Sequence, residues 1–161
     1  MSDLNKLDLK SFMAKVIKDV FETMVSMDLE LSDSNTNKEV VNGNLIVGSV
    51  GLAGDVQGNV RIHVSDDFAR AITAAMLGME LDEIEGEEEV YDVIGELSNM
   101  ISGDIKSRIC DAGFSCELST PTITSGSDYE IISQDCMRCE QLFFINEDHT
   151  ALAEVAIKLT N

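Results

Sequence analysis

The chain contains no tryptophan and a single proline, and aromatic residues make up only 5% of its 161 residues. So little proline excludes the collagen-like and proline-rich classes of protein, which need far more of this residue. No run of roughly 18 or more apolar residues occurs, so no transmembrane helix is predicted. The first ten residues, MSDLNKLDLK, lack the apolar stretch of a signal peptide. We therefore expect a cytoplasmic protein with no membrane partner.

Basic residues are also scarce. Eleven lysines and arginines stand against thirty aspartates and glutamates, which gives a formal net charge of −19 at pH 7. Such an excess of negative charge repels nucleic acids and anionic lipids, so neither is expected as the main partner. The 44% of hydrophobic residues and the length of the chain suit one globular domain spanning residues 1–161.

The four cysteines are Cys110, Cys116, Cys136 and Cys139. In a reducing cytoplasm they are expected as thiols rather than as disulfide bridges. Cys136 and Cys139 form a CxxC pair, and the four together would give a four-thiolate zinc site. Five residues separate Cys110 from Cys116, whereas about two to four are usual in such sites. This spacing favours the alternative that the cysteines are small, partly buried hydrophobic residues.

Two shorter segments have the periodicity of amphipathic helices. In residues 9–26 apolar residues, Met24 among them, recur at spacings of one, three and four, which predicts a helix that packs on a core. Residues 66–77 are predicted as a second helix. Ser65 would cap its amino terminus, and Gly78 would end it.

Alternating apolar and polar residues predict strands elsewhere. Residues 44–64 have the strongest pattern, residues 114–118 form another predicted strand near a sheet edge, and residues 140–146 and 151–159 form a hairpin. This order of helices and strands predicts an α+β fold. We expect a single domain with long helices packed on one face of a mostly antiparallel sheet.

Three other candidate sites are weaker. The glycine-rich residues 48–58 lack the lysine that closes a phosphate-binding loop, and a strand pattern follows them instead of a helix. The acidic run 82–89 lacks the ligand spacing of an EF-hand and is interpreted as a solvated loop. His63 is expected on the solvent face of its strand and His149 in the hairpin turn, and neither has an assigned catalytic partner.

The longest predicted helix, residues 88–110, carries an unusual polar face. Its apolar side chains share a sector of about 80° and are expected in the core: Val90, Ile94, Leu97, Ile101 and Ile105. On the opposite side, Asp92, Glu96, Asn99 and Gly103 share another sector of about 80°. Glu96 and Asn99 are only about 60° apart, so their side chains are able to contact one external object.

The segment GELSNMISG, residues 95–103, resembles the signature of the bacterial chemotaxis phosphatase family that includes CheC, CheX and the flagellar switch protein FliY. In that signature a glutamate, an asparagine and a glycine stand where Glu96, Asn99 and Gly103 stand here. Four further features are similar and follow in the same order: VFETM at 20–24, GDVQG at 54–58, the helix end at Gly78 and STP at 119–121.

One difference separates the chain from CheC-like members of the family. They carry the motif on two helices, whereas here Glu22 is followed three residues later by Val25 instead of asparagine. One site per chain is therefore expected, as in CheX, and the resemblance to CheX implies a homodimer joined at its sheet edges. FliY-like members have a further flagellar domain, which the chain, ending at Asn161, does not show.

The resemblance implies hydrolysis of the aspartyl phosphate on a CheY-like response regulator. Asn99 would orient the attacking water, Glu96 would pair with the regulator's active-site lysine, and Gly103 would let the partner's backbone approach. No cofactor is expected on this chain, since magnesium would come from the regulator. Asp92 is interpreted as a solvated residue. The alternatives are a non-catalytic module that binds a response regulator or flagellar switch component, and a structural dimer whose helix face binds nothing.

Overall fold

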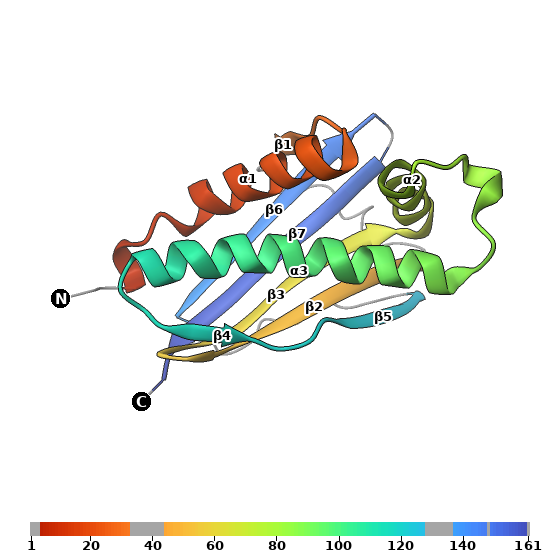
Figure 1. Cartoon of the computed structure of the whole chain (residues 1–161). Helices are drawn as coiled ribbons and strands as arrows, with labels where there is room; N and C mark the ends of the chain where they lie inside the picture. The colour runs from red at the N-terminus through yellow and green to blue at the C-terminus, as the bar shows by residue number, and fades with distance from the viewer. Residues whose placement is uncertain (1–3, 33–43, 128–136, 148, 161) are drawn as a thin grey trace.

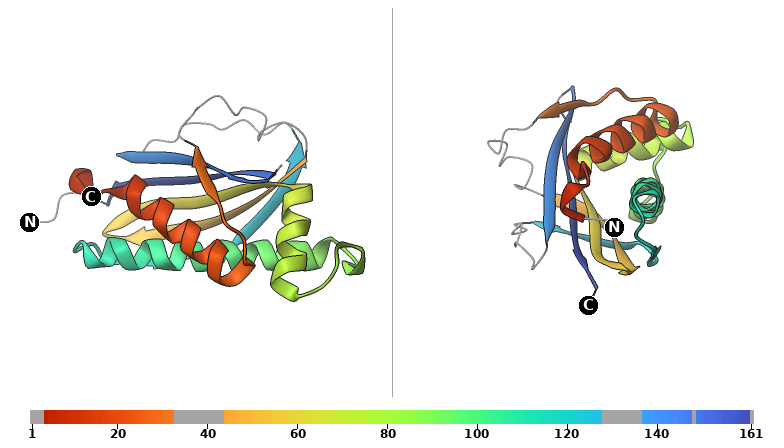
Figure 2. Two further views of the ribbon diagram at one scale, coloured as in Figure 1. Left: turned by 90° about the horizontal axis from the view of Figure 1, so that it is seen from above. Right: turned by 90° about the vertical axis from the view of Figure 1, so that its left-hand side faces the viewer.

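The computed structural model describes residues 4–32, 44–127, 137–147 and 149–160. The helices, including short 3-10 and π-helical turns, are η1 (Leu4–Lys6), α1 (Leu9–Val20), η2 (Phe21–Val25), α2 (Asp66–Leu77), η4 (Leu81–Glu83) and α3 (Glu87–Asp111). The strands are β1 (Glu30–Ser32), β2 (Asn44–Gly54), β3 (Val56–Ser65), β4 (Cys116–Leu118), β5 (Thr122–Ser127), β6 (Arg138–Asn146) and β7 (His149–Leu159). Figures 1 and 2 show two layers, with α1, α2 and α3 covering one face of the sheet.

The sheet has the strand order β1-β6-β7-β3-β2-β4, and β5 also pairs with β2. Every pairing among the described strands is antiparallel. β4 pairs with the end of β2 and β5 with its beginning, so both lie along the same side of β2. The predicted α+β fold, with helices on one face of an antiparallel sheet, is confirmed.

The main apolar core lies between the helix layer and the sheet. β3 contributes the alternate residues that its pattern predicts: Val56, Val60, Ile62 and Val64. The inward face of α3 contributes the residues of one helical stripe: Val90, Val93, Ile94, Leu97, Ile101, Ile105 and Ile109. Burial of this stripe fixes the rotation of α3 about its axis, so the opposite face of the helix stays at the surface.

α3 lies unusually close to β2. A Cβ atom built on Gly48 would lie 2.0 Å from the Oγ atom of Ser98. Ser98 is itself only 1% exposed, and its hydroxyl donates a hydrogen bond of 2.8 Å to the carbonyl oxygen of Ile94. Small residues on both elements thus allow the close approach, which holds the middle of α3 directly on the sheet.

The caps of α2 form as predicted. The Oγ atom of Ser65 accepts a hydrogen bond of 3.1 Å from the backbone N–H of Phe68, and Gly78 ends the helix in the left-handed region with φ 66°. The opening helix is shorter than predicted, because α1 ends at Val20 and continues as the π-helical turn η2.

His63 lies on the sheet face that the alternation predicts, but it is buried, with 6% of its surface exposed. Its Nε2 atom lies 2.5 Å from Oε1 of Glu154, and Gln141 donates a hydrogen bond of 2.8 Å to the other oxygen of that carboxylate. Phe143 and Leu152 form a second apolar cluster on this face, next to His63 in register. The expectation of a solvated His63 is wrong because Glu154 of β7 contacts its ring and the buried Leu152 lies beside it in register.

Of the cysteines, Cys110 is exposed and Cys116 is buried, and both are free thiols as predicted. Burial and the neighbouring Cys110 raise the pKa of Cys116 to about 11. Cys139 is disulfide-bonded, so the prediction of four thiols is wrong for this residue. Cys136 lies outside the described residues. Since a disulfide sulfur is not a thiolate ligand, a zinc site of four thiolates does not form in this structure.

No helix in the part of the chain that the structure describes is long and apolar enough to cross a membrane. The cytoplasmic location and the extent of one domain over residues 1–161 stay predictions.

Candidate functional site

α3 is the platform of the candidate site. It runs for 25 residues across the sheet, and Asn99 is its midpoint (Figure 1). Three glutamates occupy its first turn and Arg108 its last turn, so the charges at both ends are favourable to the helix dipole. The helix as a whole carries seven acidic and two basic residues, so its exposed surface attracts cationic groups.

Glu96 and Asn99 both lie exposed on the outer face of α3, while Leu97 and Ser98 between them are buried. Within the described residues, the side chains of Glu96 and Asn99 form no hydrogen bond or ion pair. Residues three apart on a helix lie side by side, so a carboxylate and an amide point outward together from a rigid support. The structure places this pair where the sequence predicts it, and the roles of the two residues stay predictions.

Gly103 follows Asn99 by about one turn and is partly exposed. A Cβ atom built there would meet no heavy atom within 4 Å. A glycine inside a helix costs roughly 0.5–1 kcal/mol relative to alanine, and packing within this chain does not require one at this position. The open space therefore suits the close approach of an external group. Asp92, one turn before Glu96, is exposed as predicted for a solvated residue.

The opening helix offers no second pair of this kind. Glu22 is exposed in η2, but Val25, three residues later, is only 1% exposed. The π-helical turn directs the side chain of Val25 into the core. Val25 thus stands, buried, at the position where CheC-like proteins carry a second asparagine. In the described residues, Glu96 and Asn99 are the one pair of this kind.

The segment around Ser119 supports α3 from the side. The Oγ atom of Ser119 accepts a hydrogen bond of 2.8 Å from the backbone N–H of Gly51, and the backbone N–H of Ser119 donates one of 2.9 Å to the carbonyl oxygen of Gly51. A Cβ atom built on Gly95 of α3 would lie 3.7 Å from Ile123 and 4.0 Å from Pro121. The STP sequence thus joins β4 to β5 along β2 and places this connection against α3.

A comparison with known protein families decides the relationship. The family model described as chemotaxis phosphatase CheX matches residues 46–145, which is more than half of the chain and includes Glu96, Asn99 and Gly103. The chain belongs to this family. The predicted resemblance to CheX is confirmed.

Individual relatives agree with this assignment to the CheX family. The CheY-P phosphatase CheX of Thermotoga maritima is 26% identical over 122 residues, which are 73% of this chain and 77% of the relative. The crystal structure of CheX from Vibrio vulnificus has a TM-score of 0.78 and 24% identity, covering 94% of this chain and 97% of that one. The CheX of the CheX–CheY–BeF3–Mg2+ complex from Borrelia burgdorferi has a TM-score of 0.73 and 19% identity, covering 95% and 99%. At these identities the two structures show the shared fold alone.

Proposed function

We propose that this CheX-family protein hydrolyses the aspartyl phosphate of a CheY-like response regulator. The observation that carries the proposal is the exposed, unpaired Glu96 and Asn99 at the middle of α3, inside the matched family region. The relative from Thermotoga is named a CheY-P phosphatase, and the structure from Borrelia is a complex of CheX with CheY, BeF3 and Mg2+. Both names support the same substrate for this chain.

Asn99 is the residue that we assign to the attacking water. An acyl phosphate is already reactive, so catalysis needs a water held in line with the phosphorus rather than a protein nucleophile. An amide both donates and accepts hydrogen bonds, so Asn99 is able to orient a water without bringing negative charge to the phosphoryl group. The buried neighbours Leu97 and Ser98 hold in place the helix backbone from which Asn99 projects.

Glu96 is assigned to binding. Its carboxylate would form a charge-assisted hydrogen bond with the lysine of the regulator's active site and thereby fix the register of α3 on the partner. Gly103 would allow the partner's backbone to lie close to the helix beyond Asn99. The acidic surface of α3 would favour this encounter with a cationic group.

Magnesium bound by the response regulator would neutralise charge on the phosphoryl oxygens. The described residues contain no group of three or more His, Cys, Asp or Glu side chains placed to hold a metal ion. We assign the metal to the partner because the Borrelia complex of CheX with CheY contains Mg2+. The two tasks of this chain are then to bind the regulator and to orient the water.

The test is the rate of phosphate loss from a purified phosphorylated response regulator with substoichiometric amounts of this protein. We expect multiple turnovers with the parent protein. Asn99→Ala should lower kcat by roughly 100-fold, because an unoriented water loses most of the benefit of positioning. Asn99→Asp, which keeps the size but adds a charge that the phosphoryl group repels, should be similarly slow. Asn44→Ala, which alters an exposed asparagine on β2, is the matched control and should keep the parent rate.

Each alternative has its own outcome. An Asn99→Ala variant as fast as the parent would contradict the assigned mechanism. A parent protein that binds the phosphorylated regulator without turnover would instead be a non-catalytic binding module. If it neither binds nor turns over any regulator tested, the helix face has a structural role alone.

A homodimer belongs to the same proposal, and β5 supports it. This strand, TITSGS, contains no charged residue, and among the described strands it pairs with β2 alone. Uncharged edge strands are templates for pairing with another chain. Pairing of two copies along β5 would extend the sheet and give an assembly with two sites.

A further inference from the structure

The turn η2 reverses the burial that helical periodicity predicts. In an α-helix of about 100° per residue, Met24 lies about 40° from Val20, within the buried stripe, and Val25 lies about 140° away, outside it. In the structure the two are exchanged, since Val25 is 1% exposed and Met24 is 48% exposed. The prediction that Met24 packs in the core is therefore wrong, and the sequence pattern alone does not reveal this exposed residue.

The backbone causes this exchange. Phe21–Val25 form a π-helical turn, which is wider than an α-helical one, and Ser26 ends it in the left-handed region with φ 59° and ψ 38°. The backbone N–H of Met27 then donates a hydrogen bond of 3.0 Å to the carbonyl oxygen of Phe21. Single π-helical turns are rare and occur frequently at functional sites, and a serine in the left-handed region is strained. The chain thus adopts an unfavourable backbone whose effect is to expose a large apolar side chain.

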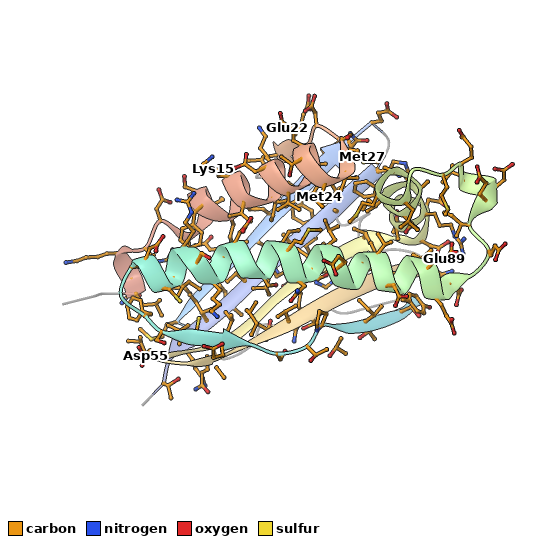
Figure 3. The ribbon with its side chains drawn as sticks, in the orientation of Figure 1. Lys15, Glu22, Met24, Met27, Asp55 and Glu89 are labelled. Carbon is orange, nitrogen blue, oxygen red and sulfur yellow. The ribbon has the colours of Figure 1, made fainter. Side chains whose placement is uncertain are left out.

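Met24 faces the helix that carries the candidate site. Figures 1 and 2 both place the end of the opening helix beside the middle of α3, where Asn99 is the midpoint. In Figure 3 Met24 lies in the space between η2 and the middle of α3, whereas Glu22 points away from α3 on the far side of the opening helix. Met24 is therefore an exposed apolar residue on the side of η2 that faces α3, the helix that carries Glu96 and Asn99.

The exposed residues of α3 that are assigned to the partner offer it no apolar contact, and Met24 would supply one. Glu96, Asn99 and Gly103 supply a carboxylate, an amide and open backbone, but no exposed apolar contact. Protein interfaces usually combine polar contacts with a few buried apolar anchors that carry most of the affinity. Methionine is flexible and polarizable and is frequent at binding surfaces that adapt to a partner.

We infer that Met24 is a docking contact for the response regulator and packs on an apolar patch of the regulator beside its phosphorylation site. This role rests on the proposed function, because it assigns the same partner to the same surface. Met24 would determine how tightly the regulator binds and would leave the orientation of the attacking water to Asn99. The surface that the regulator covers would then include η2 as well as α3.

Met137 provides a matched control. It is 45% exposed, close to the 48% of Met24, but it directly precedes β6 in the sheet and is not on a helix. Met24→Ser and Met137→Ser therefore remove the same side chain at two positions of similar exposure. Met24→Leu keeps an apolar side chain of similar size at the proposed contact.

The experiment measures two quantities for each variant. One is the dissociation constant for the regulator loaded with BeF3 and Mg2+, and the other is the pair kcat and KM for dephosphorylation. We expect Met24→Ser to raise the dissociation constant and KM roughly tenfold, as loss of an interface anchor does, with kcat within about twofold of the parent. Met24→Leu should restore most of the affinity, and Met137→Ser should match the parent.

The phosphatase function and the docking role of Met24 are contradicted by different results. If the parent binds the loaded regulator but does not dephosphorylate it, the phosphatase function fails while the binding data still decide the role of Met24. If Met24→Ser binds as tightly as Met137→Ser, or if the parent does not bind, the role of Met24 is overturned. Urea denaturation of each variant shows whether folding has changed, and a loss of affinity that merely follows a loss of folded protein also overturns it.

Discussion

At the scale of single residues, exposure distinguishes the proposed functional side chains from their neighbours in sequence. Glu96 and Asn99 are exposed and have no partner within the described residues, whereas Leu97 and Ser98 are buried and hold the helix in place. Because of this division, a substitution at either exposed position tests function with little effect on the core.

Glu96→Ala should weaken binding of the phosphorylated regulator by at least about tenfold, because it removes one partner of a charge-assisted contact. The free energy of unfolding should change by less than roughly 0.5 kcal/mol, as is usual for an exposed helix position. The dissociation constant and urea denaturation measure the two effects.

Asp104→Ala is the matched control for Glu96→Ala. Asp104 is also exposed on α3, but it lies about 80° away from Glu96 around the helix, and its loss changes the net charge equally. Equal weakening by the two variants would mean that Glu96 acts through the general charge of the surface and makes no specific contact.

Glu154 provides a prediction about pH. Burial raises the pKa of this carboxyl, but the hydrogen bonds from His63 and Gln141 and the positive charge of Arg61 outweigh burial and hold its pKa below the usual 4.5. A pKa that is lower in the folded than in the unfolded state contributes stability above pH 4.5, and this stability is lost as the pH falls through the folded-state value. The free energy of unfolding should therefore fall more steeply below pH 4.5 in the parent than in Glu154→Gln.

Denaturation by urea at a series of pH values from 7 to about 3 measures this difference. Glu117→Gln is the control, because the Glu117 side chain is 85% exposed. Parallel pH curves for the parent and Glu154→Gln would show that the contact with His63 does not favour the ionised carboxylate.

At the scale of elements, α3 combines two faces with different requirements. Its inner face must lie close to β2, which the pair Gly48 and Ser98 permits. Its outer face must accept a partner, and there Gly103 occupies open space. Glycine thus permits the close packing of α3 on β2 at Gly48, and at Gly103 it leaves space for the proposed partner.

Gly103→Ala should have opposite effects on stability and on binding. Alanine in a helix interior should stabilise the free protein by up to about 1 kcal/mol, since the added methyl group meets no atom of this chain. The same methyl group should weaken binding of the regulator, because it occupies the space that the partner's backbone would use. Urea denaturation and the dissociation constant test the two effects separately.

Gly95→Ala is the control for Gly103→Ala. A methyl group at Gly95 would make ordinary contacts with Ile123 and Pro121 of this chain, whereas one at Gly103 would meet no atom of this chain within 4 Å. It should leave binding unchanged. If Gly103→Ala binds the regulator as tightly as Gly95→Ala does, Gly103 has no role in docking.

At the scale of the whole molecule, the edge of the sheet and the net charge of −19 act in opposite directions on self-association. Negative charge keeps copies apart. The uncharged strand β5 would allow two copies to pair along one edge while the charged surfaces remain in solvent.

Thr124→Lys should dissociate the proposed dimer, because it places a charge on the exposed edge of β5. Sedimentation velocity should show a dimer for the parent and a monomer for the variant. Thr160→Lys adds the same charge at an exposed position after β7 and should stay dimeric. A parent protein that sediments as a monomer over the whole concentration range would contradict pairing along β5.

The sequence by itself determined the features that depend on local periodicity. The long helix, its buried stripe and its ridge of Glu96, Asn99 and Gly103 all follow from residues that repeat along one segment, because helical geometry fixes which side chains share a face. The pattern of β3 and the caps of α2 follow for the same reason. β5 was not predicted, because the predicted strand stops before Pro121 and the pairing with β2 resumes after it.

The tertiary structure decided what depends on contacts between distant segments. His63 is buried because Glu154, distant in sequence, meets it across two neighbouring strands. Met24 and Val25 exchange places because the opening helix ends in a π-helical turn, which periodicity at 100° per residue does not anticipate. The positions of Glu96, Asn99 and Gly103 on α3 could thus be predicted from the sequence. The exposure of Met24 depends on the π-helical turn that ends the opening helix.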